Sequence, residues 1–372
     1  NGFLVPVGKR WKMPKLAETL RKVASEGADY IYKGAWGQKF VKMANKQGYR
    51  VSMQDMEEYE PKWDKPVRFT YRGHEIIGSP PPDTGGLVVG YNLNILENFD
   101  LKSLGHYAKS PETLEIMARA FGRVRDETRW AIKDPLNFYI PSELWLLKDY
   151  GKMCAQFVQN TMVISNVNLA PSKKDKALPQ KTLNPQFPLL DEENDAYLGS
   201  NHNVIVDAQG NWISLLHTLH GGAPGIFIDG VRALGSGARA YTLGPGRRLV
   251  LPITSIMIVK DGKPWLAMGT PGSPPQPVTE VLVNILDFKM SPKEAAEAPR
   301  FWTFRGDERS VDIESRITKE LREAMASRGI KLKDLGAYNW HTGSMQIIWR
   351  DEKTGKLHGV TDPRRLGYAA GY

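Results

Sequence analysis

The sequence predicts a layered α+β protein, and three observations support that fold class. Apolar side chains recur every three or four positions within residues 14–50 and 112–130, a spacing typical of helices. After residue 200 the pattern changes to β-branched runs separated by polar turns. With 372 residues, the chain is long enough to bury a large core, in one large domain or two smaller ones. Helices before and after two blocks of strands fit a layered body.

The first half of the chain is predicted to be mainly helical. Two amphipathic helices are expected within residues 14–50, and Gly27 is expected to end the first. Ser52 is of a residue type that caps helices, and the Pro-Pro-Pro-Asp-Thr-Gly-Gly run over 80–86 predicts a rigid turn. The other expected elements are a helix start over 52–57, a hairpin of strands 67–71 and 75–77, an apolar helix running from the proline turn through Leu96, and a helix over 112–130.

The second half of the chain is predicted to begin after a linker. Residues 168–197 are rich in proline and charge, which indicates either an exposed, mobile linker or an ordinary surface loop. The elements expected after it are strands over 203–206, 212–219, 249–259 and 264–268, helices over 278–288 and 292–298, and a late hairpin of strands 344–349 and 357–360.

Composition excludes several classes of function. The net charge of +9 is spread along the chain, and no nucleic-acid-binding motif accompanies it, so no nucleic-acid partner is expected. No apolar run approaches the roughly 20 residues that span a bilayer, so no membrane span is expected. The single cysteine, Cys154, excludes an internal disulfide and a multi-cysteine zinc site. Its apolar surroundings predict a buried side chain.

The stretch from Gly199 to Asn211 is the most informative part of the sequence. Ser200 follows a glycine and opens a β-branched run, which ends in a polar Asp-x-x-Gly-Asn turn over 207–211. A self-cleaving N-terminal nucleophile hydrolase needs such a hydroxyl residue at the start of a strand. Cleavage before Ser200 would free its α-amine, which would then act as the general base for its own hydroxyl. Ser200 is alternatively an ordinary loop serine.

Three of the seven histidines, His202, His217 and His220, lie close together in this region. The cluster raises the hypothesis of a metal site. Side chains of residues 217 and 220 would point to opposite faces of one strand, however, and no acidic residue stands at a supporting spacing. No metal and no cofactor are therefore expected.

Several motifs occur in the order found in one known family. They are the proline turn over 80–86, the Leu-Asn-Ile-Leu-Glu run over 93–97, residues 295–300, and the Asp-Pro-Arg-Arg run over 362–365. With these motifs the chain resembles the gamma-glutamyltransferase family over nearly its whole length. That resemblance implies a four-layer αββα sandwich of the N-terminal nucleophile hydrolase type, made from one precursor that cuts itself into a large and a small subunit.

The resemblance also implies a division of the chain. Residues 1–199 correspond to the second part of the large subunit and end in the linker, residues 200–372 correspond to the small subunit, and together they form one αββα domain. The sequence opens at Asn1 with no visible signal peptide, and its opening is expected to come from the middle of a longer protein. A stretch that precedes it in the family, with an arginine that holds the substrate carboxylate, is expected on a missing N-terminal portion or on a partner chain.

The chemical half of the family's site is largely present. Ser200-Asn201-His202 stands where the family has Thr-x-His, and the cut falls between Gly199 and Ser200. Thr218 occupies the place of a second threonine that bonds the nucleophile; alternatively it is a plain sheet residue. The backbone N–H groups of Gly272 and Ser273 stand where the family has its Gly-Gly oxyanion hole.

The half of the site that recognises the glutamyl group has changed. The family's asparagine falls on His220, its aspartate on or near Ala240, and its serine pair on Leu251-Pro252. A buried α-ammonium without its carboxylate loses a charge-assisted hydrogen bond worth roughly 1.5–3 kcal/mol. The remaining residues assigned to the substrate pocket are Asn201, His202, Arg239 and Tyr241. Arg239, together with Arg247 and Arg248, either binds an acidic group of the substrate or is an ordinary solvated loop residue. Tyr241 is alternatively a residue of the pocket wall or of the core.

The resemblance and the changed residues predict an amide hydrolase or acyltransferase with altered acyl specificity. The expected substrate is a small-molecule amide or peptide, and a homo- or hetero-oligomer is expected, in the periplasm or secreted. An alternative is a non-catalytic relative that serves as a structural or binding subunit of an assembly. A further alternative, unaltered γ-glutamyl transfer, would require the lost arginine and aspartate to be supplied differently.

Overall fold

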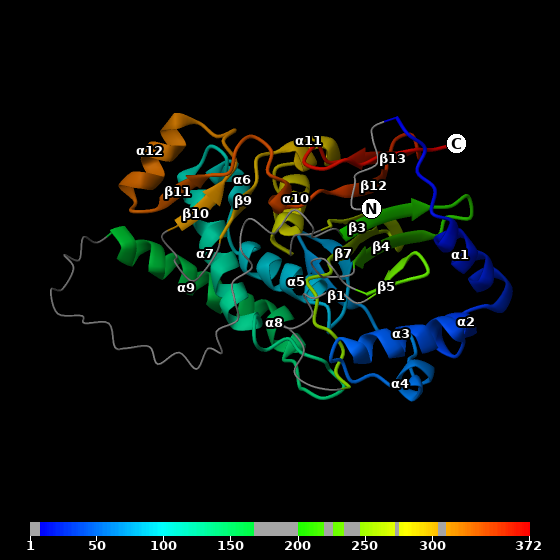
Figure 1. Cartoon of the computed structure of the whole chain (residues 1–372). Coiled ribbons are helices and arrows are strands. Elements are labelled where there is room, and N and C mark those ends of the chain that lie inside the picture. The colour runs from blue at the N-terminus through cyan, green and yellow to red at the C-terminus, as the bar shows by residue number, and fades with distance from the viewer. Residues whose placement is uncertain (1–7, 167–199, 219–225, 234–245, 272–274, 304–309) are drawn as a thin grey trace. The chain divides into compact units, whose positions relative to one another are not determined.

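The computed structural model describes residues 8–166, 200–218, 226–233, 246–271, 275–303 and 310–372 (Figure 1). These residues divide into two compact units. Of the described residues, unit 1 comprises 8–64 and 226–233, and unit 2 comprises the others. The predicted linker over 168–197 and the bond before Ser200 lie outside the described residues.

Unit 1 is a small helical body with one short hairpin. Trp36 donates its indole N–H to the carbonyl oxygen of Ile228 at 3.3 Å, and Lys39 Nζ lies 2.6 Å from Asp229 Oδ2. These contacts bind the hairpin to the helices through their shared apolar core. Ser52 forms a capping box with Asp55, as its residue type predicts. The elements are α1 Pro14–Glu26, α2 Asp29–Tyr32, α3 Ala35–Lys46, α4 Met53–Glu57, β5 Ile226–Ile228 and β6 Val231–Ala233.

Unit 2 is built on a six-stranded antiparallel sheet in the order β1-β2-β7-β8-β12-β13. The first two strands form the hairpin predicted around Arg72-Gly73, and the last two form the predicted late hairpin. A separate sheet has the order β11-β10-β9. The strands are β1 Val67–Tyr71, β2 His74–Gly78, β7 Ser255–Lys260, β8 Lys263–Gly269, β9 Phe301–Trp302, β10 Ser310–Ile313, β11 Lys331–Asp334, β12 Gln346–Arg350 and β13 Leu357–Thr361.

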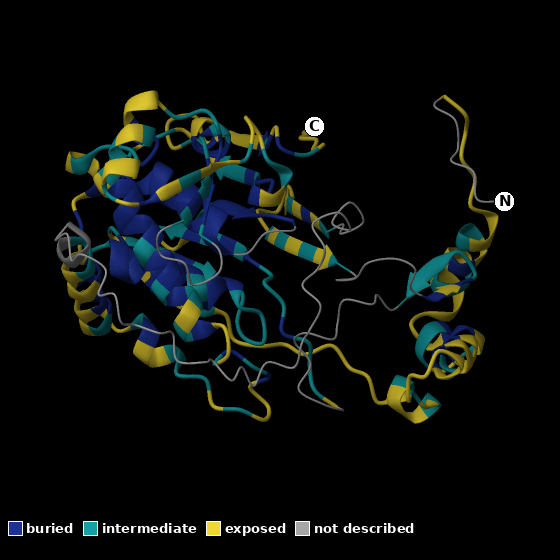
Figure 2. Ribbon diagram, turned by 60° about the vertical axis from the view of Figure 1, so that its left-hand side comes forward, coloured by how far each residue is buried: buried dark blue, intermediate teal, exposed yellow. Residues whose placement is uncertain are grey.

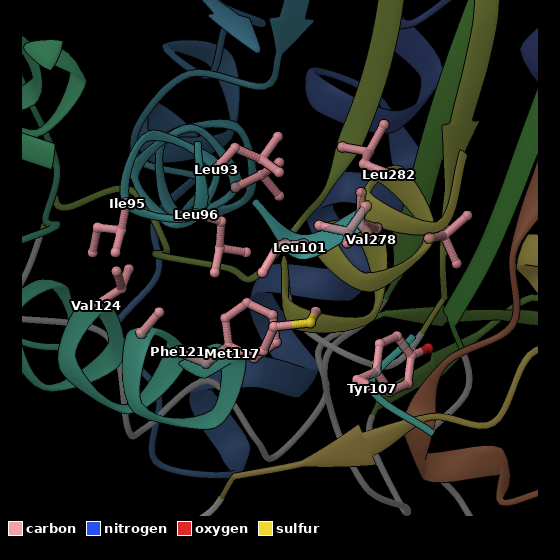
Figure 3. Close-up of a cluster of buried hydrophobic side chains, with 14 of the residues drawn as sticks. Leu93, Ile95, Leu96, Leu101, Tyr107, Met117, Phe121, Val124, Val278 and Leu282 are labelled. Carbon is pink, nitrogen blue, oxygen red and sulfur yellow. The ribbon is translucent and has the colours of Figure 1, made fainter. Parts of the chain in front are cut away.

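Helices cover one face of the large sheet. Apolar side chains of α5, α7 and α10 point toward one another in the core between these helices (Figure 3). Most of this layer is dark blue in Figure 2, as expected for a helix layer inside a large core. The helices of unit 2 as a whole are α5 Gly85–Leu96, α6 Leu101–Leu104, α7 Pro111–Thr128, α8 Ser142–Leu146, α9 Lys148–Asn166, α10 Pro275–Leu286, α11 Pro292–Glu297 and α12 Lys319–Ser327.

The glycines of the proline turn explain how α5 approaches the sheet. A Cβ on Gly85 would lie 1.9 Å from the carbonyl oxygen of Ile253, so only glycine fits there. Cys154 of α9 is buried, as predicted, with its sulfur 3.3 Å from the Tyr91 hydroxyl.

A hairpin of β3 Ser200–Val206 and β4 Trp212–Thr218 forms a second β layer. It contacts β7, β8 and β12. On β8, Leu266 and Met268 belong to the helix-side core, whereas Gly269 contacts His202 of the hairpin. Because side chains alternate along a strand, the hairpin and the helices cover opposite faces of the sheet. The described part of unit 2 therefore has the order helices, sheet, hairpin.

The predicted strand over 249–259 is wrong in its first half. The strand starts only at Ser255, because the preceding residues bond to the turn before α5 instead of to the sheet. Leu251 O accepts from Thr84 N at 2.9 Å, and Ile253 O accepts from Ser79 Oγ at 2.9 Å. Pro252 has no backbone N–H that could donate to a neighbouring strand. The elements not predicted from the sequence include α2, α6, α8, α9, α12, β5, β6 and the β9–β11 sheet.

Candidate active site

The polar turn predicted at 207–211 closes the hairpin that carries Ser200. Asp207 accepts from the backbone and side-chain nitrogens of Asn211, each at 2.8 Å. This turn fixes the register, so that Ser200 lies directly opposite Thr218. The Ser200 Oγ donates to the Thr218 Oγ1 at 3.0 Å. The structure thus brings together the predicted nucleophile and its predicted partner.

The two faces of β3 have different surroundings. Ser200 and His202 lie on the same face, which is at least partly buried, whereas Asn201 lies on the exposed face. Alternation therefore directs the Asn201 side chain away from the Ser200–Thr218 pair. His217, opposite Asn201 on β4, is exposed on that same outer face.

His202 is enclosed between the layers. Its exposed fraction is 4%, and its Nε2 lies 3.0 Å from Ser214 Oγ. Burial lowers the pKa of His202 to about 4, so the imidazole is neutral at physiological pH. At this exposure it presents almost no surface to a bound molecule.

The segment expected to hold an oxyanion begins at the end of β8. Thr270 is fully buried; its Oγ1 accepts from Ser344 N at 2.7 Å and donates to Pro271 O at 3.0 Å. Gly272 and Ser273 lie outside the described residues, and α10 starts at Pro275 just beyond them. The positive end of that helix dipole favours negative charge close to its first turn.

A buried network of charges supports this segment from the other side. Arg300 pairs with Asp362 and donates to the carbonyl oxygen of Thr342 at 2.9 Å. Arg364 pairs with Asp362 at 3.1 Å and with Glu314 at 2.6 Å. All four charged side chains of these pairs are at most 1% exposed. The motifs over 295–300 and 362–365 thus supply a scaffold next to the Thr270 contact, a role that the sequence did not reveal.

The other predicted pocket residues are placed only in part. Arg248 pairs with Asp134 at 3.1 Å, and the Arg247 guanidinium lies 5.4 Å from the centre of the Phe138 ring. Both arginines therefore have protein partners. The predicted residues that lie outside the described part of the chain are Gly199, His220, Arg239, Ala240, Tyr241, Gly272 and Ser273.

Within the described ranges, no three His, Cys, Asp or Glu side chains are grouped so that they could hold a metal ion. The helices described here include none that is both long and apolar enough to cross a bilayer.

A hydroxyl at the first position of a strand, on a hairpin that packs against a helix-covered sheet, fits the class of N-terminal nucleophile hydrolases. Within that class the chain belongs to the gamma-glutamyltranspeptidase family, whose model matches residues 1–372.

Curated relatives include two kinds of protein. The glutathione hydrolase proenzyme of Escherichia coli is 28% identical, covering 96% of this chain and 61% of its own length. The acylase ACY 1 proenzyme of Pseudomonas sp. strain SE83 is 27% identical, covering 87% of this chain and 56% of its own. The chain thus spans about three fifths of the length of these relatives.

A solved structure shows the same fold. The cephalosporin acylase from Bacillus halodurans aligns with a TM-score of 0.73 at 22% identity, over 99% of this chain and 64% of its own.

Proposed function

We propose that this chain carries the nucleophile of an amide hydrolase or acyltransferase, with Ser200 as the attacking residue after self-cleavage of the Gly199–Ser200 bond. The observation that carries this proposal is the 3.0 Å hydrogen bond from Ser200 Oγ to Thr218 Oγ1 at the start of β3. Membership of the gamma-glutamyltranspeptidase family and the proenzyme relatives support it.

The maturation step uses only the chain and water. Ser200 Oγ attacks the Gly199 carbonyl carbon, and the peptide C–N bond breaks as an ester forms. Water then hydrolyses this ester, leaving a carboxylate on Gly199 and a free α-amine on Ser200. That amine has the position and basicity needed to accept the hydroxyl proton in the later reaction.

Turnover follows the same logic on an external amide. Ser200 Oγ attacks the substrate carbonyl, its proton passes to the α-amine, and that proton then goes to the departing amine nitrogen. Water or a second amine attacks the resulting ester and releases the acyl group. Thr218 accepts the Ser200 hydroxyl bond in the resting state and orients the nucleophile. The backbone N–H groups of Gly272 and Ser273 are proposed to hold the oxyanion.

The proposed acyl group differs from glutamyl. The acidic partner of the substrate ammonium is replaced at or near Ala240, and the family's serine pair by Leu251-Pro252. In the structure, the backbone oxygens of those two residues accept hydrogen bonds from Thr84 and Thr254. Their side chains offer no hydroxyl to a substrate carboxylate. An acyl chain without the α-amino group fits such a pocket better.

A matched substrate series tests this specificity. The p-nitroanilides of γ-glutamate, glutarate and butyrate differ stepwise by loss of the α-amino group and then of the carboxylate. We expect kcat/KM to be higher for the glutaryl than for the γ-glutamyl compound, and Ser200→Ala to abolish both. A preference for γ-glutamyl would refute the altered specificity, and equal turnover by Ser200→Ala would refute the nucleophile.

A further inference from the structure

The buried side chain of His202 joins the nucleophile strand to the strand that leads into the oxyanion segment. Ser200 and His202 share the inward face of β3. His202 Nε2 lies 3.0 Å from Ser214 Oγ on β4, and Ser214 Oγ donates to Met268 O on β8 at 3.3 Å. A continuous set of polar contacts therefore runs from β3 through β4 to the last residues of β8.

These contacts also define the tautomer of the imidazole. Because the single hydroxyl proton of Ser214 goes to Met268 O, its oxygen accepts from His202, which must then carry its proton on Nε2. His202 Nδ1 is buried and has no hydrogen-bond partner among the described residues. A second ring proton would therefore be a buried, unpaired donor, and the arrangement favours the neutral ring.

The absence of a side chain on Gly269 leaves room for the imidazole ring of His202. A Cβ on Gly269 would lie 2.2 Å from His202 Nε2 and within 2.7 Å of two ring carbons. The backbone of Gly269 does not lie in the left-handed region, so its conformation alone does not require glycine. The imidazole is what excludes a side chain there. The next residue, Thr270, starts the segment that leads to Gly272 and Ser273.

We propose that His202 is a positioning residue: its imidazole, seated on Gly269 and bonded to Ser214, sets the spacing between Ser200 and the end of β8. The inference rests on the proposed role of Ser200. It assigns His202 no contact with substrate. Catalytic geometry is sensitive to such spacing, since a displacement of about 1 Å costs on the order of 100-fold in rate.

The first test compares substitutions on the two faces of the hairpin. His202→Ala removes the spacer, His202→Gln keeps a side-chain N–H for Ser214, and His217→Ala removes an exposed histidine from the outer face as the control. With glutaryl p-nitroanilide as substrate, we expect His202→Ala to lower kcat about 10- to 100-fold with KM nearly unchanged. His202→Gln should restore part of kcat, and His217→Ala should match the parent.

The second test uses the fit between ring and glycine. Gly269→Ala in the parent should lower kcat, because the new methyl displaces the imidazole. In the His202→Ala background the same methyl enters the space that the ring has left. We therefore expect the double variant to be more active than the product of the two separate losses predicts.

The outcomes separate the two proposals. A parent that neither cleaves itself nor hydrolyses the anilides overturns the proposed function and, with it, this role of His202. An active parent with a His202→Ala variant that matches His217→Ala overturns the positioning role alone. A rise in KM at constant kcat would make His202 a substrate contact, and strictly multiplicative losses in the double variant would show that ring and glycine act separately. Either result overturns the proposal.

Discussion

The nucleophile hairpin and the buried charge network differ in their side-chain chemistry and in the role that this chemistry serves. The hairpin presents two hydroxyls and a neutral imidazole, with Ser200 partly exposed. The network consists of fully buried arginine–carboxylate pairs that hold backbone carbonyls. A reacting group has to exchange protons and partners, whereas a support has to keep one geometry. The two regions should therefore fail in opposite ways when a side chain is removed.

The largest expected effect is loss of activity without loss of stability. Ser200→Ala should remove the nucleophile and lower amide hydrolysis by more than about 1,000-fold, because no other group supplies the attacking oxygen. The side chain is only partly buried, so the melting temperature should remain close to that of the parent. Activity assays and thermal unfolding of the same preparation measure both. A large drop in the melting temperature of Ser200→Ala would contradict the proposed difference between the hairpin and the charge network.

The opposite behaviour is expected in the charge network. Asp362→Ala leaves Arg300 and Arg364 without their shared carboxylate, and breaking a buried pair costs about 3–5 kcal/mol. Lys260→Ala provides the control, since its pair with Glu352 is exposed and such pairs contribute at most about 1 kcal/mol. Urea unfolding gives both values. Equal losses in the two variants would contradict a supporting role for the buried network.

A smaller effect is expected at Thr218. Thr218→Val keeps the shape of the side chain but removes the oxygen that accepts from Ser200, a hydrogen bond worth about 1 kcal/mol. We expect roughly a fivefold fall in kcat, since 1.4 kcal/mol corresponds to a factor of ten. Thr218→Ser, which retains the hydroxyl, is the matched control. If the valine variant keeps the parent's kcat, the hydrogen bond does not orient the nucleophile.

A further expected effect is a change in how stability depends on pH. Burial holds the pKa of His202 at about 4, below the ordinary value of about 6.5, so the unfolded chain binds the extra proton first as pH falls. This histidine therefore contributes stability above about pH 6.5 that is lost progressively toward pH 4. His202→Gln should reduce that slope in urea unfolding measured from pH 7 to 4. An unchanged slope in His202→Gln would contradict this contribution of His202.

Local sequence signals predicted the polar turn and the β-branched runs on its two sides, whereas only the family resemblance implied the pairing of Ser200 with Thr218. The Asp207–Asn211 turn closes two β-branched runs, and that turn places Ser200 opposite Thr218. The same alternation puts His202 on the face of Ser200, but alternation does not say what covers that face. The assignment of His202 to a substrate pocket was therefore open to revision, and its burial emerged only from the packing on β8.

The sequence patterns did not predict contacts between residues that are far apart in the chain. Arg300 and Asp362 are far apart in the chain and meet only because α11, β12 and β13 converge. The sequence therefore showed their two motifs but not the ion pair that the motifs form. The short strands of the β9–β11 sheet contain too few residues for a period of two to show. Residues 249–254 have strand-like composition but bond to the turn before α5.

The most direct test of the nucleophile is the denatured mass of the purified protein, combined with N-terminal sequencing. We expect two pieces, one of which begins with Ser200-Asn201-His202, and a single uncut chain in the Ser200→Ala variant. A parent chain that stays intact across Gly199–Ser200 would leave the Ser200 amine in a peptide bond and without function as a base. That result would contradict the enzyme proposal and favour a non-catalytic subunit.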